Sequence, residues 1–325
     1  TVAANVAGVN SFADRYRVTS SNPTSSLDAG DLAFVTGDSN LKFYNGSSWT
    51  SIAPGIANVV DDSTPQLGGN LDLNSNSITG TGNLDIANGT IKLDGDYPTG
   101  TGNVAMGNAS LDSGSLSGNF NTAIGSTSLT DNTSGASNVG VGYGSLANNT
   151  TGGSNTAMGV NSLEANQTGS NNVALGTQAL DANTGSNNTA VGYQSLVLNT
   201  SGTYNTAVGT LALDANQTTN SNTAIGYAAL GVNVASNNTA VGTSALDANT
   251  SGATNVAVGV AALGANTTAS NNVAVGASAL SANTSGSCNI AIGTNAMDST
   301  TTSSSNIAIG FQALQATNTN GSNLA

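Results

Sequence analysis

The chain has 325 residues and a net charge of −13, and only 6% of its residues are charged and 4% aromatic. This composition excludes an ordinary enzyme core, which requires more Leu, Phe and Ile. The basic residues are Arg15, Arg17, Lys42 and Lys92. The rest of the chain therefore cannot neutralise phosphates, and we expect no nucleic-acid partner. No apolar run approaches the ~20 residues of a membrane span, so we expect no membrane insertion.

The first segment, residues 1–18, has the apolar spacing of a helix. Its apolar side chains recur at intervals of four and three residues and lie on one helical face. We expect the end of a helical stem here, with a frayed terminus as the alternative. The residues on this face are Val2, Val6, Val9, Phe12 and Tyr16.

Residues 19–58 predict a small β module. The runs 31–36 and 41–44 are strand-like, and Asn45-Gly46 is a tight-turn signal before a third run at 48–52. The only Trp of the chain, Trp49, falls in this segment. We interpret its aromatic residues as a small core, and a platform for a glycan is the alternative.

Residues 59–100 contain short runs in which apolar and polar residues alternate. Leu71-Asp72-Leu73 and Ile91-Lys92-Leu93 are examples, and this period of two is typical of brief strands. None of these runs can close a core within one chain. We therefore expect an intertwined shaft in which three chains wind together.

Several of these segments resemble tail fibres of marine bacteriophages. The resemblance rests on residues 12–18, 21–24, 30–34 and 41–49, and on the run that begins Asp61-Asp62-Ser63-Thr64-Pro65. It implies a virion appendage that is extracellular when assembled. The expected partners are other virion tail proteins at the N-terminal side and a host cell-surface polysaccharide or protein.

Residues 101–325 repeat one phrase thirteen times: Asn, a Thr/Val/Ile, Ala, an aliphatic residue, Gly, two variable residues, a small residue and Leu. The phased apolar residues argue against disorder. The period of about 17 residues predicts an all-β fold, a trimeric parallel β-solenoid or β-roll built from stacked units. The first copy begins at Asn103. The later copies begin at Asn121, Asn138, Asn155, Asn172, Asn188, Asn205, Asn222, Asn238, Asn255, Asn272, Asn289 and Asn306.

Positions within a repeat are counted from this leading Asn as zero. Gly occupies position four in every copy, which indicates a turn that a Cβ would obstruct or a close contact between layers. Ten copies carry a second Asn, and the length varies after it, as in a surface turn. We expect two short strands and two turns per repeat. The leading Asn residues predict a hydrogen-bonded ladder, with isolated turn residues in a left-handed conformation as the alternative.

The alternation of strand residues divides the repeat into two faces. We expect Ala at position two to face Leu at position eight inside the solenoid, while the aliphatic residue at position three faces a neighbouring chain. The opposite assignment is the alternative. Covering such a stripe requires oligomerisation, and a homotrimer closes it in a fibre. The predicted trimer-facing stripe is Ile124, Val191, Val208, Ile225, Val241, Val258, Val275, Ile292 and Ile309.

The nine-residue phrase is similar to the head repeats of trimeric autotransporter adhesins. That resemblance implies a left-handed parallel β-roll trimer over residues 101–325. It does not fix the function, because such repeats also occur in tail-fibre proteins. This chain departs from the family in its longer period.

We predict no catalytic residue, metal ligand or cofactor. The chain has no His, which excludes His-based triads and imidazole metal sites. Asp181, Asp214 and Asp247 follow the repeat Leu and share equivalent environments, whereas glycoside hydrolysis needs two different ones. Weak cation binding by this row is the alternative. Position five carries four aromatic residues, which we interpret as braces against a neighbouring chain or, alternatively, as glycan contacts: Tyr143, Tyr193, Tyr227 and Phe311.

The sequence therefore favours a structural protein, the trimeric shaft of a bacteriophage tail fibre that projects a host-recognition tip and contributes to host cell adhesion. The alternative is a bacterial trimeric surface adhesin whose roll binds ligand directly. Ice binding is set aside, because Val and Ile interrupt the Thr row at position one. We also expect that a tip or a trimer-assembling domain once followed the repeats and was removed by cleavage.

Overall fold

The computed structural model describes residues 15–25, 27–52, 100–315 and 322–325. Its compact units fall within residues 1–85 and 86–325, and each is described by itself. Every element of the described residues is a β-strand, and none of these residues belongs to a helix long and apolar enough to cross a membrane. Most of the predicted stem and nearly all of the predicted intertwined shaft lie outside the described residues.

The N-terminal module is a four-stranded sheet in the order β1-β2-β3-β4. Strand β1 pairs with β2 in parallel, and the other neighbours are antiparallel. Ala33 and Val35 on β2 are its buried apolar residues. The predicted tight turn is present, with Asn45 Oδ1 accepting the main-chain N–H of Ser48 at 2.8 Å. The strands are β1 (Tyr16–Thr19), β2 (Leu32–Val35), β3 (Asn40–Tyr44) and β4 (Trp49–Ser51).

The expectation of helix is wrong for the end of the stem, since residues 16–18 belong to strand β1. Tyr16 lies opposite Leu32 and Val18 opposite Phe34 in the sheet. Pairing with a strand distant in sequence outweighs the local apolar spacing, because β preference depends on the partners that a strand finds.

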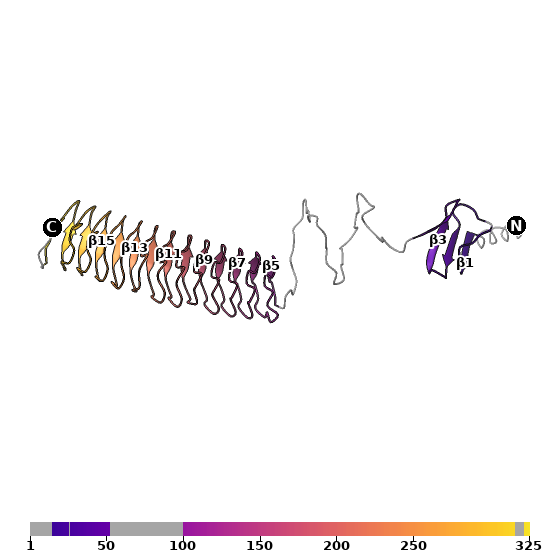
Figure 1. Cartoon of the computed structure of the whole chain (residues 1–325), viewed down its shortest axis with the longest axis horizontal. Helices are drawn as coiled ribbons and strands as arrows, with labels where there is room; N and C mark the ends of the chain where they lie inside the picture. Colours follow the sequence, from indigo (N-terminus) through magenta and orange to yellow (C-terminus); the bar gives the residue numbers. More distant parts are fainter. Residues whose placement is uncertain (1–14, 26, 53–99, 316–321) are drawn as a thin grey trace, which may run out of the picture. The chain divides into compact units, whose positions relative to one another are not determined.

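The second unit is a parallel β-solenoid, as predicted (Figure 1). Each repeat forms one rung, and each rung contributes one three-residue strand to a thirteen-stranded sheet in sequence order. Neighbouring strands pair position for position, as in Thr189 with Thr206 and Ala190 with Ala207. The strands are β5 (Val104–Met106), β6 (Thr122–Ile124), β7 (Val139–Val141), β8 (Thr156–Met158), β9 (Val173–Leu175), β10 (Thr189–Val191), β11 (Thr206–Val208), β12 (Thr223–Ile225), β13 (Thr239–Val241), β14 (Val256–Val258), β15 (Val273–Val275), β16 (Ile290–Ile292) and β17 (Ile307–Ile309).

A partial fourteenth rung lies on β17. Leu324 bridges Ile307 in parallel, and the main-chain N–H of Asn323 donates to Asn306 Oδ1 at 3.1 Å. Asn323, Leu324 and Ala325 thus occupy positions zero, one and two of a further repeat. The sequence interpretation did not recognise this register.

The core contains the residues assigned to it, Ala at position two and Leu at position eight. Ala207 and Leu213 are both fully buried, as are their equivalents in the inner rungs, whereas Ala105 in the first rung and Leu314 in the last are partly buried. The side chains at positions one and three of the strand point away from this core, because side chains alternate along a strand. The alternative with aliphatic residues inside and Ala outside is therefore wrong.

The second strand expected in each repeat is absent from the described rungs. The residues at positions six and eight have left-handed dihedral angles, as in Gln194 (φ 53°) and Leu196 (φ 51°). Such angles are uncommon for residues other than glycine. They still allow bonding between rungs: Leu196 N–H donates to Ala212 O of the next rung, and Gln194 N–H to Thr177 O of the previous one, both at 3.0 Å. This side of the rung is a hydrogen-bonded turn without β geometry.

The glycine at position four satisfies both reasons proposed for it. Its φ lies between +128° and +139° in all thirteen rungs, a conformation that side chains rarely adopt. A Cβ on Gly209 would also lie 2.5 Å from the carbonyl oxygen of Gly226 in the next rung. The turn and the close contact between layers both require glycine.

The leading Asn residues form a continuous ladder through the main chain. Asn205 N–H donates to Asn188 Oδ1 at 3.0 Å, and Asn188 Nδ2 donates to Gly202 O at 2.8 Å. The same N–H to Oδ1 bond joins every leading Asn to the one before it. None of them has a left-handed φ, so the reading as isolated turn residues is wrong.

The second Asn of the repeat forms a separate ladder between side-chain amides. Asn149 Nδ2 donates to Asn132 Oδ1 at 2.7 Å, and Asn199 Nδ2 to Asn183 Oδ1 at 2.6 Å. The ladder is interrupted between Asn166 and Asn183 and again between Asn216 and Asn233, where Asn233 Nδ2 donates instead to Ala235 O. Asn166 Oδ1 is buried with no hydrogen-bond partner. The two interruptions coincide with the two rungs that have sixteen residues instead of seventeen, which begin at positions 172 and 222.

Candidate functional site

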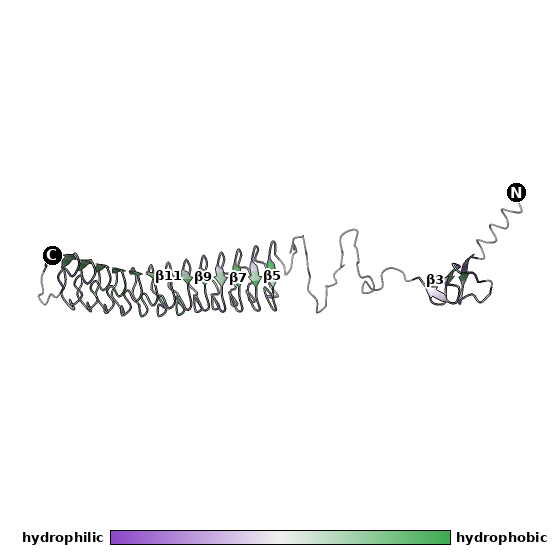
Figure 2. Ribbon diagram, turned by 90° about the horizontal axis from the view of Figure 1, so that it is seen from above, coloured by the Kyte–Doolittle hydropathy of each residue, from purple (hydrophilic) through white to green (hydrophobic). Residues whose placement is uncertain are grey.

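The lateral surface of the solenoid carries an uncharged face on the strands, with an apolar residue at position three of every rung and Thr, Val or Ile at position one. Positions one and three point outward from every strand, and none of the thirteen rungs has a charged residue there. Figure 2 shows these strands coloured toward the hydrophobic end of the scale. The predicted trimer-facing residues lie together on this outward strand face, half-buried or exposed, with Ile124 at 38% and Ile309 at 60%. Such a face can bury apolar area against a partner without desolvating a charge.

The predicted aromatic residues lie at the corner that follows the strand. Tyr143, Tyr193, Tyr227 and Phe311 are all exposed. Position five comes after the glycine turn, so these side chains border the outward strand face and are not part of it.

Two further exposed aromatics were missed by the sequence interpretation. Phe120 and Tyr204 precede a leading Asn and are exposed, with φ values of 58° and 60°. Their shared place before the repeat Asn was the available signal. All six aromatic residues of positions 101–325 are thus exposed at two corners of the rung.

Hydrogen bonds hold the corner at position five from rung to rung. The main-chain carbonyl of Tyr143 accepts the main-chain N–H of Asn161 at 2.9 Å, and the main-chain carbonyl of Tyr193 accepts that of Leu211 at 3.0 Å. Amide side chains lie beside the aromatics, with Gln194 Nε2 donating to Gln178 Oε1 at 3.0 Å. The side chains at this corner therefore project from a rigid backbone.

The acidic row at position nine is less uniform than expected. Burial raises the pKa of Asp181 to about 6, and the charge of Glu164 on the preceding rung adds to the effect. Burial also raises the pKa of Asp214, with a smaller contribution from the charge of Asp247. The expectation of equivalent environments is wrong, because only Asp181 has a carboxylate on the adjacent rung. No group of three potential metal ligands occurs among the described residues.

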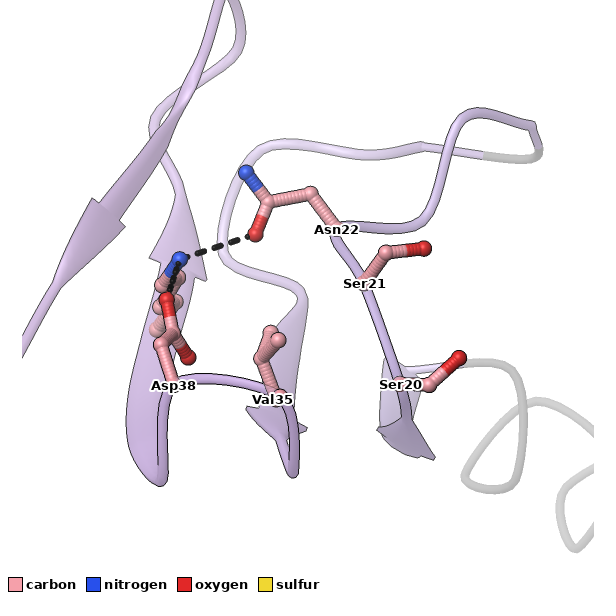
Figure 3. Close-up of a pocket in the computed structure, with 7 residues that line it drawn as sticks. Ser20, Ser21, Asn22, Val35 and Asp38 are labelled. Atoms are coloured by element: carbon pink, nitrogen blue, oxygen red, sulfur yellow. Dashed lines mark hydrogen bonds and ion pairs between the residues drawn. The ribbon is translucent and has the colours of Figure 1, made fainter.

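The N-terminal module has a pocket of about 390 Å³ beside β2 and β3 (Figure 3). Lys42 Nζ lies 2.5 Å from Asp38 Oδ2 and donates to Asn22 Oδ1 at 3.0 Å. The hydrogen bond from Lys42 lowers the pKa of Asp38 below its ordinary value. Because the ammonium group is already paired with protein groups, the pocket indicates no ligand class.

Comparisons with known proteins give no relative for this chain: no family model, curated protein or solved structure matches it. The class is therefore defined by the fold itself, which is that of a parallel β-solenoid protein with a long uncharged strand face.

Proposed function

We propose that this chain is a structural component of a bacteriophage tail fibre, a homotrimeric shaft that projects a host-recognition tip and contributes to adhesion. The resemblance of residues 12–73 to marine phage fibres supports the virion assignment. The observation that carries the proposal is the outward strand face, which is uncharged through thirteen rungs in register and apolar at position three of every rung.

Copies of the same chain fit this face better than other partners. A strand of three residues at a spacing of ~4.8 Å gives a face on the order of 600 Å² over the stack, close to the ~800 Å² that each partner buries in a stable interface. An identical solenoid has the same spacing and matches rung to rung. The acidic residues lie at positions nine and ten, away from the face, so contact does not bring these charges together. Three copies close the interface around an axis.

The trimer can be tested on the full chain. Native mass spectrometry is expected to give the mass of three chains. The double substitution Val191→Asp and Val208→Asp puts charges into the face and is expected to release monomers, because unpaired buried carboxylates are costly. Ser201→Asp adds a charge at an exposed turn and serves as the control that keeps the wild-type mass. A monomeric wild-type chain would contradict the proposal.

The virion assignment needs a separate measurement. Gold-labelled antibodies against residues 103–314 are expected to decorate fibres on the tails of virions in electron micrographs. Decoration of bacterial envelopes in place of virions would favour the second candidate, a trimeric surface adhesin. The exposed corner aromatics favour that candidate specifically, because they offer ligand contacts on the solenoid itself.

A further inference from the structure

The six aromatic residues of the solenoid are distributed in an unusual way. Aromatic side chains carry large apolar areas and are normally used in cores, yet this core is made of Leu and Ala, and every aromatic is exposed. Single exposed apolar residues need no explanation. Exposure of all six aromatic residues at two corner positions does need an explanation, because a turn position in a polar repeat accepts Thr or Ser equally well.

Three of these aromatics form one row. Tyr143, Tyr193 and Tyr227 occupy position five on the third, sixth and eighth rungs, where they are 58%, 49% and 55% exposed. The row covers five steps between rungs, or ~24 Å at a spacing of ~4.8 Å. We propose that this row, the tyrosine track, binds a neutral glycan chain that lies along the solenoid axis.

The surroundings of the track supply the polar contacts that a glycan requires. Gln178 and Gln194 lie at position six between the first and last tyrosines, and their mutual hydrogen bond leaves amide groups available to hydroxyls. Asn161 lies at the same position one rung after Tyr143, but its Oδ1 is buried, so the two Gln residues are the amides available to a glycan. Aromatic platforms for the apolar faces of sugar rings thus alternate with amides for their hydroxyls.

The track is preorganised by the hydrogen bonds at its corner. The main-chain carbonyl of Tyr227 accepts the main-chain N–H of Ser244 at 2.9 Å, and the main chains of the other two tyrosines are held in the same way. A Tyr side chain has only two rotatable angles, so little conformational freedom is lost when it contacts a ligand. A rigid corner reduces the cost of binding further.

Charge selects the class of glycan. Residues 101–325 contain seven carboxylates and no Lys, Arg or His. An anionic polysaccharide would meet no cation here and would be repelled by the acidic residues. A neutral chain has no such cost, and its hydroxyls match the uncharged amides beside the tyrosines.

The tyrosine track stays accessible when the strand face is covered. Positions one and three belong to the strand, whereas position five follows the glycine that ends it. This inference deepens the proposed function, because it assigns a ligand to the side of the shaft. It rests on the proposed function only for where the glycan comes from, which is the host cell surface.

Binding can be measured with the full chain on a panel of neutral hexasaccharides (gluco-, manno- and galacto-oligosaccharides), with alginate hexasaccharide as the anionic probe. We expect at least one neutral probe to bind and alginate not to bind. Tyr193→Ala is expected to weaken the binding about tenfold, because it removes the central platform. Tyr193→Phe retains the ring and is expected to keep most of the binding.

Tyr204→Ala is the matched control, because it removes the same type of exposed side chain from the other corner of the same rung. It is expected to leave glycan binding unchanged. Absence of binding across the neutral panel, or an equal loss in Tyr204→Ala, would overturn the inference. So would a loss of the trimer mass in Tyr193→Ala, since that would identify the residue as a brace between chains. A chain that is monomeric yet binds the neutral probe would instead contradict the proposed trimeric shaft and support glycan binding by the tyrosine track.

Discussion

The N-terminal module holds its strands together with charges and aromatic rings, whereas the solenoid uses repeated amides. Both ion pairs found among the described residues belong to the module. Its Trp49 indole N–H donates to Pro23 O at 2.9 Å, and the ring lies 5.5 Å from that of Tyr44. In the solenoid, fully buried Asn side chains bond to the neighbouring rungs.

This difference shows how repetition changes the cost of burying polar groups. A buried amide is expensive unless its donors and acceptors are paired. In a single small module each such pairing needs its own arrangement. In a stack with one register, the partner that satisfies one Asn occurs again on each rung, so the same solution serves the whole length. The solenoid can therefore fill its interior with Asn, Ala and Leu and keep aromatics for its surface.

The largest effect is expected from a single methyl group between rungs. In Gly209→Ala the new Cβ would lie 2.5 Å from Gly226 O at a φ of 136°. Backbone strain costs about 1–3 kcal/mol, and overpacking costs about 1–3 kcal/mol more. We expect the upper part of the combined range, because the contact is with main chain and no side-chain rotation relieves it. Urea unfolding followed by circular dichroism measures the loss.

The neighbouring residue provides the control for that prediction. Thr210 is exposed on the same rung, and Thr210→Ala is expected to change stability by less than about 0.5 kcal/mol. Equal midpoints for the two variants would show that the layers are not in close contact at this glycine.

A smaller effect is expected from the core. Leu196 is fully buried and Leu198, on the same rung, is 48% exposed. Leu196→Ala should cost about 3 kcal/mol, within the usual range for a buried Leu, because the stacked rungs cannot collapse into the space left behind. Leu198→Ala removes the same atoms from the surface and should cost far less. Similar unfolding midpoints in urea would mean that the assignment of the inner face is wrong.

The repeat made the parallel stack and its glycine turn predictable from the sequence. Strict phase identified the parallel stack, and the invariant glycine indicated its turn. The left-handed φ of Leu196 could not be predicted from the sequence, because it opposes the residue's own preference and is set by bonds to adjacent rungs. The strand at residues 16–19 was missed for a related reason, since its partner lies at residues 32–35.

The candidate site was predictable to a similar degree. The position of Tyr193 in the repeat identified it as a surface aromatic, and the structure adds the hydrogen-bonded corner that holds it. Tyr204 was not predicted, because the position before the leading Asn carries a small or polar residue in most repeats and so gives no aromatic pattern. The unequal acidic row depends on which rungs lie next to each other, as with Glu164 and Asp181, and this becomes clear only when the register is known.

The smallest effect is the dependence of stability on pH, which is expected to have opposite signs in the solenoid and in the N-terminal module. Asp181 has a pKa of about 6 in the folded solenoid, above its ordinary value of 3.8. The folded state therefore binds a proton more tightly than the unfolded state does, and stability rises as the pH falls from about 7 through 6 toward 4. The lowered pKa of Asp38 in the module acts in the opposite direction, because protonation of that carboxylate at lower pH removes its bond with Lys42.

The measurement is the thermal midpoint of the solenoid between pH 7 and pH 5. We expect a modest rise on acidification in the wild type, since Asp181 is partly hydrated and its effect is screened. Asp181→Asn replaces the carboxylate with an uncharged amide of similar shape, so it should raise the midpoint at pH 7 and flatten the dependence on pH. Asp38→Asn is the control and should leave the slope of the solenoid transition unchanged. If the thermal midpoint of the wild type decreases when the pH is lowered from 7 to 5, Asp181 is stabilised in its ionised form. The contrast between the two regions would then be removed.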